Sequence, residues 1–225
     1  MTNEEIFSRV DHTLLKAAAS WTEIQKLSEE GLQYKTASVC IPPSYVKKVS
    51  EAYRGLAICT VIGFPLGYST TAMKMREAEE ALANGAAELD MVINLGDVKN
   101  ARFSAVLEEI KTLKRITGKR ILKVIIETCY LEQDEKIRMC KIVSEAGADF
   151  IKTSTGLGPA GAKMEDITLF KEHIGPGVRM KAAGGIRTRE DMEAFINAGC
   201  ERLGTSSALT ILSGTIPSGK AGSGY

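Results

Sequence analysis

The chain has 225 residues, of which 44% are hydrophobic and 25% are charged, and its formal net charge is +1. These values predict one α/β domain over residues 1–225, and the evenly spread lysines and arginines argue against a nucleic-acid binder. No apolar run approaches the roughly 18 residues of a membrane span, and the N-terminal segment lacks a signal-peptide pattern. We therefore expect a cytoplasmic protein with small-molecule partners, no nucleic acid and no membrane.

Eight short apolar runs alternate with segments whose apolar residues lie three and four apart, as in Leu107, Ile110 and Leu113. Plausible helix caps open some of these segments, among them Ser20 and the capping box from Thr188 to Asp191. The expected strands are 10–15, 37–41, 57–64, 88–94, 121–127, 149–154, 178–185 and 200–207. This alternation predicts a single (β/α)₈ TIM barrel, with a mobile Gly/Ser-rich tail from about residue 213. An open doubly wound sheet is the alternative, although no GxGxxG follows the first strand.

The cysteines and histidines do not form a recognisable metal or redox motif. The five cysteines are an odd number without a CxxC pair, and four of them lie in or beside apolar runs, so we expect reduced core residues. A catalytic cysteine is the less favoured reading, because only His12 and His173 could partner it. The two histidines lie far apart and no HxH or HxxE spacing occurs, so no metal is predicted.

Charged residues share one face of four consecutive expected strands. Side chains alternate along a strand, so Asp90, Lys123, Lys152 and Lys181 lie opposite the apolar positions of their strands. If the apolar faces pack on the helices, these charges point into the barrel, where they must be paired. One interpretation is a purely structural network in which Glu88, Asp90 and Glu127 neutralise Lys123, Lys152, Arg179 and Lys181.

The functional interpretation depends on where two lysines lie. Lys152 and Lys181 should face each other on adjacent strands about 4.8 Å apart, near the strand ends where such barrels hold their chemistry. Like charges at short range penalise the charged form, so we expect Lys181 to lower the pKa of Lys152. A neutral amine is what a Schiff-base nucleophile requires.

Two small-residue turns follow the last two expected strands, and each enters a helix. Loops after strands 7 and 8 commonly bind phosphate in these barrels through backbone N–H groups. The expected phosphate-binding residues are Gly156, Gly184, Gly185, Gly204, Ser206 and Ser207.

Several motifs together resemble one family. The segments "DHTLL", "SVCIPP", "TVIGFPLG", "ELDMVIN", "LKVIIET", "AGADFIKTSTG", "KAAGGIRT" and "LGTSS" occur in unbroken order from Val10 to Ser207. They are similar to the deoxyribose-phosphate aldolases, class I aldolases of the (β/α)₈ type. The resemblance implies reversible cleavage of 2-deoxy-D-ribose 5-phosphate to D-glyceraldehyde 3-phosphate and acetaldehyde through a lysine Schiff base, with no metal and no other cofactor. Family members associate as dimers or tetramers, so a homo-oligomer is expected.

The resemblance also implies roles for individual residues. Lys152 would form the Schiff base, Lys181 would tune it, and Asp90 would join in proton transfer; the terminal Tyr225 would reach the active site. Leu157 stands where some members carry a lysine, so the phosphate would depend more on backbone amides. The expected substrate-binding residues are Thr13, Cys40, Lys123 and Thr153.

Two other functions remain open from the residues alone. A phosphosugar isomerase or epimerase on the same barrel would use Asp90 and Glu127 as acid and base and would form no imine. A non-catalytic phosphometabolite-binding barrel would bind phosphate without turnover. The paired lysines favour the aldolase over both alternatives.

Overall fold

A computed structural model describes residues 1–213 of the chain. Eight parallel strands close into a barrel in chain order, which confirms the predicted (β/α)₈ fold. The strands are β1 (Val10–Thr13), β2 (Ser38–Ile41), β3 (Ile58–Ile62), β4 (Glu88–Val92), β5 (Ile121–Ile125), β6 (Phe150–Lys152), β7 (Arg179–Ala183) and β8 (Cys200–Thr205). Each strand lies within its predicted run. Tyr225 and nearly all of the expected tail lie outside the described residues.

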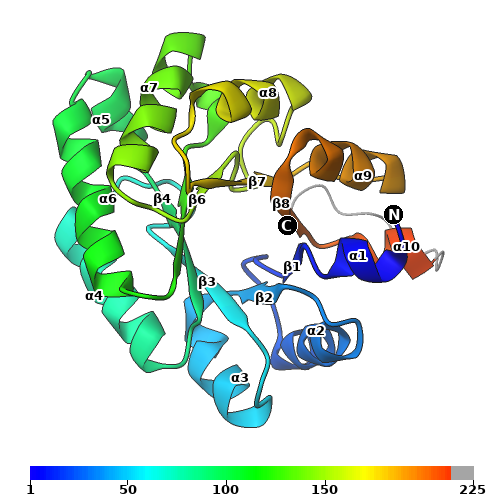
Figure 1. Cartoon of the computed structure of the whole chain (residues 1–225). Helices are drawn as coiled ribbons and strands as arrows, with labels where there is room; N and C mark the ends of the chain where they lie inside the picture. The colour runs from blue at the N-terminus through cyan, green and yellow to red at the C-terminus, as the bar shows by residue number, and fades with distance from the viewer. Residues whose placement is uncertain (214–225) are drawn as a thin grey trace.

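Helices surround the barrel (Figure 1). They are α1 (Asn3–Phe7), α2 (Trp21–Gln33), α3 (Val46–Ala52), α4 (Thr71–Ala83), α5 (Leu95–Lys99), α6 (Phe103–Thr117), α7 (Gln133–Glu145), α8 (Met164–His173), α9 (Arg189–Ala198) and α10 (Ala208–Ser213), with short 3-10 turns at Pro43–Tyr45 and Thr128–Tyr130. The first and last of these helices lie side by side, and the Asn3 side chain donates to the Leu212 carbonyl at 3.0 Å. None of the described helices is long and apolar enough to span a bilayer.

The core lies between the strands and the surrounding helices. Leu89 and Met91 of β4 and Leu122 and Val124 of β5 are fully buried on the outer face of the barrel. Burying one such side chain stabilises the fold by about 1.5–3 kcal/mol. The apolar side chains on the outer face therefore hold the helices in place. The side chains on the opposite face of each strand point toward the barrel axis.

The local signals at helix starts are confirmed. Ser20 and Glu23 form a reciprocal capping box at the start of α2, and Thr188 and Asp191 form another at the start of α9.

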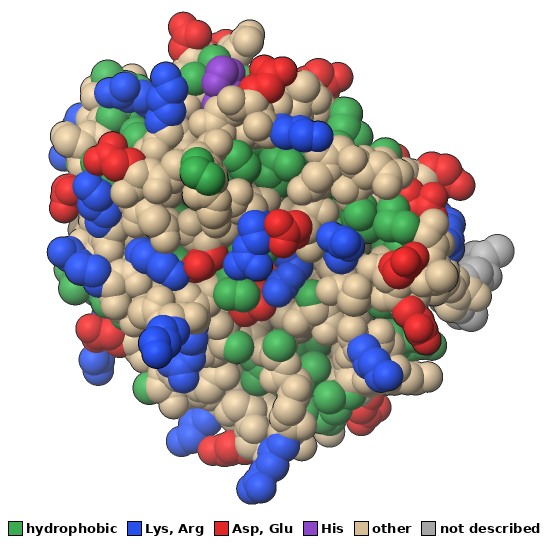
Figure 2. Space-filling model, viewed as in Figure 1, with side chains coloured by type: hydrophobic (Ala, Val, Ile, Leu, Met, Phe, Trp, Pro, Cys, Tyr) green, Lys and Arg blue, Asp and Glu red, His purple; other side chains and the backbone are tan. Residues whose placement is uncertain are grey.

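Figure 2 shows positive and negative side chains interspersed over the face in view, so that face has no basic stripe.

A buried ion pair outside the barrel ties α4 to α6 and to the end of β4. The Lys74 side chain is fully buried, and its Nζ donates to Glu109 Oε2 and to the Val92 carbonyl, both at 2.8 Å. The Lys74 stem also fills the space beside Gly63, where an added Cβ would lie 2.7 Å from Lys74 Cε. Lys74 thus fixes the backbone two residues beyond Asp90.

We expect Lys74→Met to lower the free energy of unfolding by about 3–5 kcal/mol, because it leaves the Glu109 carboxylate buried without its cation. The double variant Lys74→Met/Glu109→Leu should recover much of that loss, since both charges are then gone. Urea denaturation of the wild type, the two single variants Lys74→Met and Glu109→Leu, and the double variant gives the coupling free energy between Lys74 and Glu109. Losses that simply add would contradict this account of the pair.

Candidate active site

The inner faces of the strands bring the predicted charged residues together. Lys152 lies directly opposite Lys181 across β6 and β7, and Asp90 lies directly opposite Lys123 across β4 and β5. All four residues are at least 97% buried. The strand alternation therefore places them as the sequence indicated.

Asp90 is the centre of the site. Its Oδ2 accepts hydrogen bonds from Lys152 Nζ at 2.8 Å and from Lys181 Nζ at 2.7 Å. Its Oδ1 accepts from Lys123 Nζ at 2.8 Å and from the Cys59 thiol at 3.2 Å. One carboxylate thus orients three lysines, and the two facing lysines share a single oxygen.

Asp11 and Glu88 complete the network on the side away from Lys152. Asp11 Oδ2 accepts from Lys181 at 2.5 Å, and Glu88 lies 2.6 Å from Lys123. The Arg202 guanidinium donates to both carboxylates, at 2.6 Å to Asp11 and at 2.8 and 2.9 Å to Glu88. A fork of this kind holds two carboxylates in fixed positions.

The network holds one more cation than it holds carboxylates. Its members are Lys123, Lys152, Lys181, Arg202, Asp11, Glu88 and Asp90. Lys123 pairs with three carboxylates, and Lys181 and Arg202 pair with two each. Among the described residues, Lys152 pairs with Asp90 alone, so it is the lysine of the network with the fewest carboxylate partners.

The pKa shifts follow from these pairings. Burial disfavours the charged forms of Asp90 and Lys181, but the surrounding opposite charges outweigh it. Lys123, Lys152 and Lys181 hold the pKa of Asp90 well below its usual range despite its burial. Burial likewise works against Lys181, yet Asp11 and Asp90 raise its pKa well above the ordinary value. Lys181 is therefore a cation at neutral pH beside Lys152.

Thr13 and Cys40 lie beside this network on β1 and β2. Thr13 is the strand partner of Cys40, which in turn is the partner of Cys59 on β3. A hydrogen bond with Cys59 lowers the pKa of Cys40, while burial raises the pKa of Cys59. Two groups that each combine Cys59 with a carboxylate have metal-like spacing, but lysine or arginine nitrogens already bind those carboxylates. The absence of a metal stays a prediction.

The glycines predicted to bind phosphate come together from two loops. An added Cβ on Gly184 would lie 3.1 Å from the Cα atoms of Gly156 and Gly161, so the backbones after β6 and β7 are in close contact. Gly184 and Gly185 have φ of +79° and +74°, a conformation that only glycine adopts readily. These glycines form a small open cradle of backbone at the end of the barrel that carries Lys152.

The remaining predicted phosphate residues have other contacts. The amides of Arg187 and Thr188 donate to Asp191, so the capping box satisfies the start of α9. Gly204 lies within β8, where an added Cβ would come within 3.1 Å of Lys181 Cε. Ser206 and Ser207 lie in the turn after β8, and the Ser207 amide donates to the Thr205 hydroxyl at 3.1 Å. Phosphate binding by Gly156, Gly184, Gly185, Gly204, Ser206 and Ser207 stays a prediction.

Two residues assigned to the structural network have different roles. Glu127 lies beyond the end of β5 and binds the Thr155 amide, with no ion pair among the described residues. Arg179 stacks on the Phe150 ring with a 4.0 Å separation and lies 3.9 Å from Glu201. Neither residue forms an ion pair with the central cluster within the described chain, because a turn redirects Glu127 and Arg179 lies at the start of its strand.

Thr153 and Tyr225 differ from the other predicted site residues. The Thr153 hydroxyl exchanges hydrogen bonds with the backbone of Ala183, at 3.2 and 3.3 Å, and so extends the contact between β6 and β7. Its role in substrate binding stays a prediction. Tyr225 lies outside the described residues.

The sequence interpretation missed Asp11, Arg202 and Cys59. The signal for all three was available, because each lies on the inward face of its strand by the same alternation that identified Asp90. These three residues lie on β1, β8 and β3, whereas the face predicted from the sequence covers β4 through β7.

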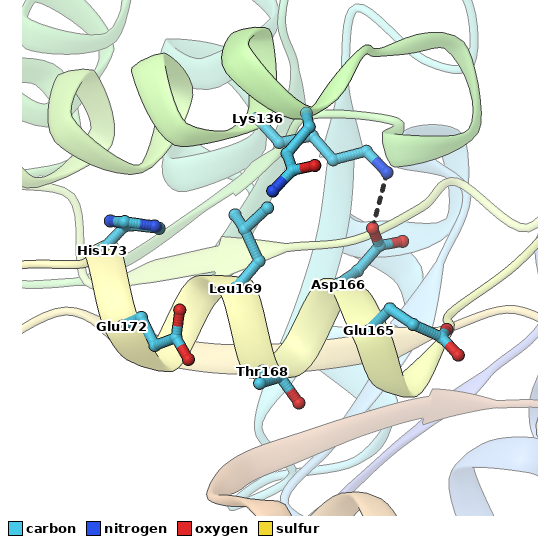
Figure 3. A pocket seen from close by; sticks show the side chains of 8 residues that line it. Lys136, Glu165, Asp166, Thr168, Leu169, Glu172 and His173 are labelled. Carbon is cyan, nitrogen blue, oxygen red and sulfur yellow. Dashed lines mark hydrogen bonds and ion pairs between the residues drawn. The ribbon is translucent and has the colours of Figure 1, made fainter.

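One surface groove lies away from this cluster. A groove of about 420 Å³ runs between α7 and α8, outside the barrel, and the Lys136–Asp166 ion pair of 2.7 Å crosses it (Figure 3). Most of its lining residues come from α8, including Glu165 and Glu172. The groove contains no member of the lysine network, so its size does not make it the active site.

Asp90→Asn should lower the free energy of unfolding by about 3–5 kcal/mol at pH 7, because three buried lysines lose their shared carboxylate. The folded state holds the pKa of Asp90 below its unfolded value of about 3.9, so this contribution is complete above that pH and lost as the pH falls further. Urea denaturation at pH 7 and pH 3 should show the difference from wild type shrinking in acid. A difference independent of pH would contradict the charge-based explanation.

Comparisons with known proteins agree with this geometry. The sequence matches the DeoC/LacD family aldolase over residues 6–214. The chain is 59% identical over 215 residues to a deoxyribose-phosphate aldolase of Clostridium botulinum, covering 95% of this chain and 97% of the relative. It is 57% identical to one of Clostridioides difficile, covering 93% and 96%.

Solved structures give the same result. The tetrameric deoxyribose phosphate aldolase of Aeropyrum pernix superimposes with a TM-score of 0.88 at 32% identity, covering 94% of this chain and 91% of that one. An aldolase named QR15 superimposes with a TM-score of 0.89 at 40% identity, covering 93% and 95%. The family match over nearly the whole chain and these identities show that the chain belongs to the DeoC/LacD family of aldolases.

Proposed function

We propose that the protein is a deoxyribose-phosphate aldolase. It would cleave 2-deoxy-D-ribose 5-phosphate reversibly to D-glyceraldehyde 3-phosphate and acetaldehyde through a Schiff base on Lys152. The observation that carries the proposal is the buried lysine pair on one oxygen of Asp90, in a network with one surplus cation. The curated relatives at 57–59% identity are named deoxyribose-phosphate aldolases, which supports the choice of substrate.

The chemistry begins at Lys152. Its neutral amine adds to the aldehyde carbon of the open-chain sugar, and loss of water gives an iminium. The iminium draws electrons from the bond between C2 and C3 while the C3 hydroxyl loses its proton to a base. The bond breaks, and glyceraldehyde 3-phosphate leaves an enamine of acetaldehyde on Lys152. Protonation of the enamine carbon and hydrolysis release acetaldehyde and restore the amine.

Asp90 and Lys181 are placed to move the protons. Asp90 contacts Lys152 directly, and its depressed pKa keeps it as an acceptor at neutral pH. Lys181 contacts the same oxygen and is a cation at neutral pH, so it would donate a proton to a departing hydroxide and recover it through Asp90 or a water. Lys123 holds the other oxygen of Asp90 and fixes its orientation.

The phosphate would lie on the glycine cradle. Backbone from Gly156 and from Gly184 and Gly185 meets there, and backbone amides in turns of this kind bind anions. Leu157, where some family members carry a lysine, is 45% exposed and adds no charge. Self-association stays a prediction, supported by the tetrameric relative from Aeropyrum pernix. The cytoplasmic location also stays a prediction, with which the five free cysteines are compatible.

Lys152→Leu should remove retro-aldol cleavage by at least about 10⁴-fold while the protein stays folded, because no other amine replaces the nucleophile. The assay follows release of glyceraldehyde 3-phosphate and acetaldehyde from 2-deoxyribose 5-phosphate, with circular dichroism as the folding control. Retained cleavage would remove Lys152 from this role. Isomerisation of the sugar phosphate without cleavage would favour the isomerase alternative instead.

Lys181→Leu should move imine formation to higher pH, by at least about one pH unit, because it removes the surplus cation from the network. The rate of imine formation with acetaldehyde is measured from pH 5 to 10. Lys114→Leu is the matched control, because Lys114 pairs with Asp149 outside the network. An unchanged profile in Lys181→Leu would contradict the tuning role.

A further inference from the structure

Glu127 is a buried carboxylate that the proposed chemistry does not use. Its residue is 97% buried, and no Lys or Arg nitrogen of the described chain lies within ion-pair distance of it. Its backbone has φ 47° and ψ 68°, the left-handed conformation that a glutamate adopts at some cost in energy. Burial without a cation and an unfavourable backbone both destabilise the fold, and such features persist mainly at functional sites.

The Glu127 side chain holds the loop that follows Lys152. The Thr155 amide donates to both of its oxygens, at 3.1 and 3.2 Å. The Thr155 hydroxyl accepts from the Leu157 amide at 3.1 Å. An added Cβ on Gly158 would lie 3.4 Å from the Glu127 carboxylate, so the loop closes tightly around this side chain.

The loop after Lys152 also contacts Gly184, the part of the glycine cradle that follows β7. An added Cβ on Gly161 would lie only 2.3 Å from the Gly184 carbonyl, so the two backbones are in direct contact. The Ala162 amide donates to the carbonyls of Ala183 and Gly184, at 3.1 Å each. A displacement of the loop at Thr155 would therefore reach both Gly156 and Gly184.

We propose that Glu127 is a positioning residue that sets the preference for phosphorylated over non-phosphorylated substrates. It acts by holding the Thr155 amide, and through it the glycine cradle, in the conformation that binds a phosphate monoester. This inference rests on the proposed aldolase function and on phosphate binding at the cradle. The reach of the side chain is the essential property, and its charge is not.

Two substitutions at Glu127 separate the effect of side-chain length from the effect of side-chain charge. Glu127→Gln keeps an oxygen at the position that accepts from Thr155 and loses the charge. Glu127→Asp keeps the charge, tolerates the left-handed backbone well, and withdraws the carboxylate by about 1.5 Å, beyond hydrogen-bond distance of the Thr155 amide. The readout is the ratio of kcat/KM for 2-deoxyribose 5-phosphate to kcat/KM for 2-deoxyribose.

We expect Glu127→Asp to reduce this ratio about tenfold or more through a higher KM for the phosphorylated sugar, and Glu127→Gln to stay within about threefold of wild type. Asp149→Ala is the matched control. Asp149 also accepts a backbone amide between the same two strands, from Leu122 at 2.8 Å, but at their opposite ends. It should lower stability and leave the ratio unchanged.

The opposite pattern, with Gln impaired and Asp normal, would overturn the proposal and assign Glu127 a role through its charge. An unchanged ratio in both variants would also overturn it. Calorimetric binding of inorganic phosphate to wild type and variants distinguishes failure of the proposed aldolase function from failure of the proposed role of Glu127. If the wild type does not cleave 2-deoxyribose 5-phosphate, the proposed function fails, while weaker phosphate binding in Glu127→Asp would still support the role of Glu127. Equal phosphate binding in all variants, or none in the wild type, would reject that role.

Discussion

The carboxylate of Asp90 is the interaction on which the site depends. An ion cannot stay buried in a barrel without opposite charge, and Asp90 supplies it to Lys123, Lys152 and Lys181 at 2.7–2.8 Å. Closure of the eight strands is what brings these residues together, because they come from four different strands. The apolar side chains on the outer face pack against the helices. The charged side chains on the inner face must therefore pair with one another.

The pairing is unequal, and the inequality gives the site its chemistry. Asp11 pairs with both Lys123 and Lys181, and Glu88 pairs with Lys123. Among the described residues, Lys152 has Asp90 as its one ion-pair partner. Under the proposed function, two lysines of identical chemistry and similar burial therefore have different roles. Two carboxylates hold Lys181 as a cation, whereas Lys152 contacts one within the described chain and is the nucleophile of the proposed reaction. The same inequality explains why a structural network and a catalytic site need not be alternatives here.

Much of this could be predicted from the sequence, because a period of two along a strand fixes which side chains share a face. Lys152 and Lys181 follow directly from that rule, and so do Asp11 and Arg202 when it is applied to every strand. The turn at Glu127 could not be predicted in this way. The alternation placed Glu127 beside Lys123, but a left-handed backbone carries its carboxylate to the Thr155 amide. The contact of Gly161 with Gly184 was equally inaccessible, because it joins two loops whose paths only the folded chain defines.

The most direct test of the central claim is to ask which lysine forms the imine. The protein is incubated with acetaldehyde and borohydride, and the reduced adduct is located by peptide mass mapping of Lys123, Lys152 and Lys181. The charge distribution predicts an ethyl adduct on Lys152 and on neither of the other two. An adduct on Lys181 or Lys123, or an unmodified protein that still cleaves the sugar phosphate, would contradict it.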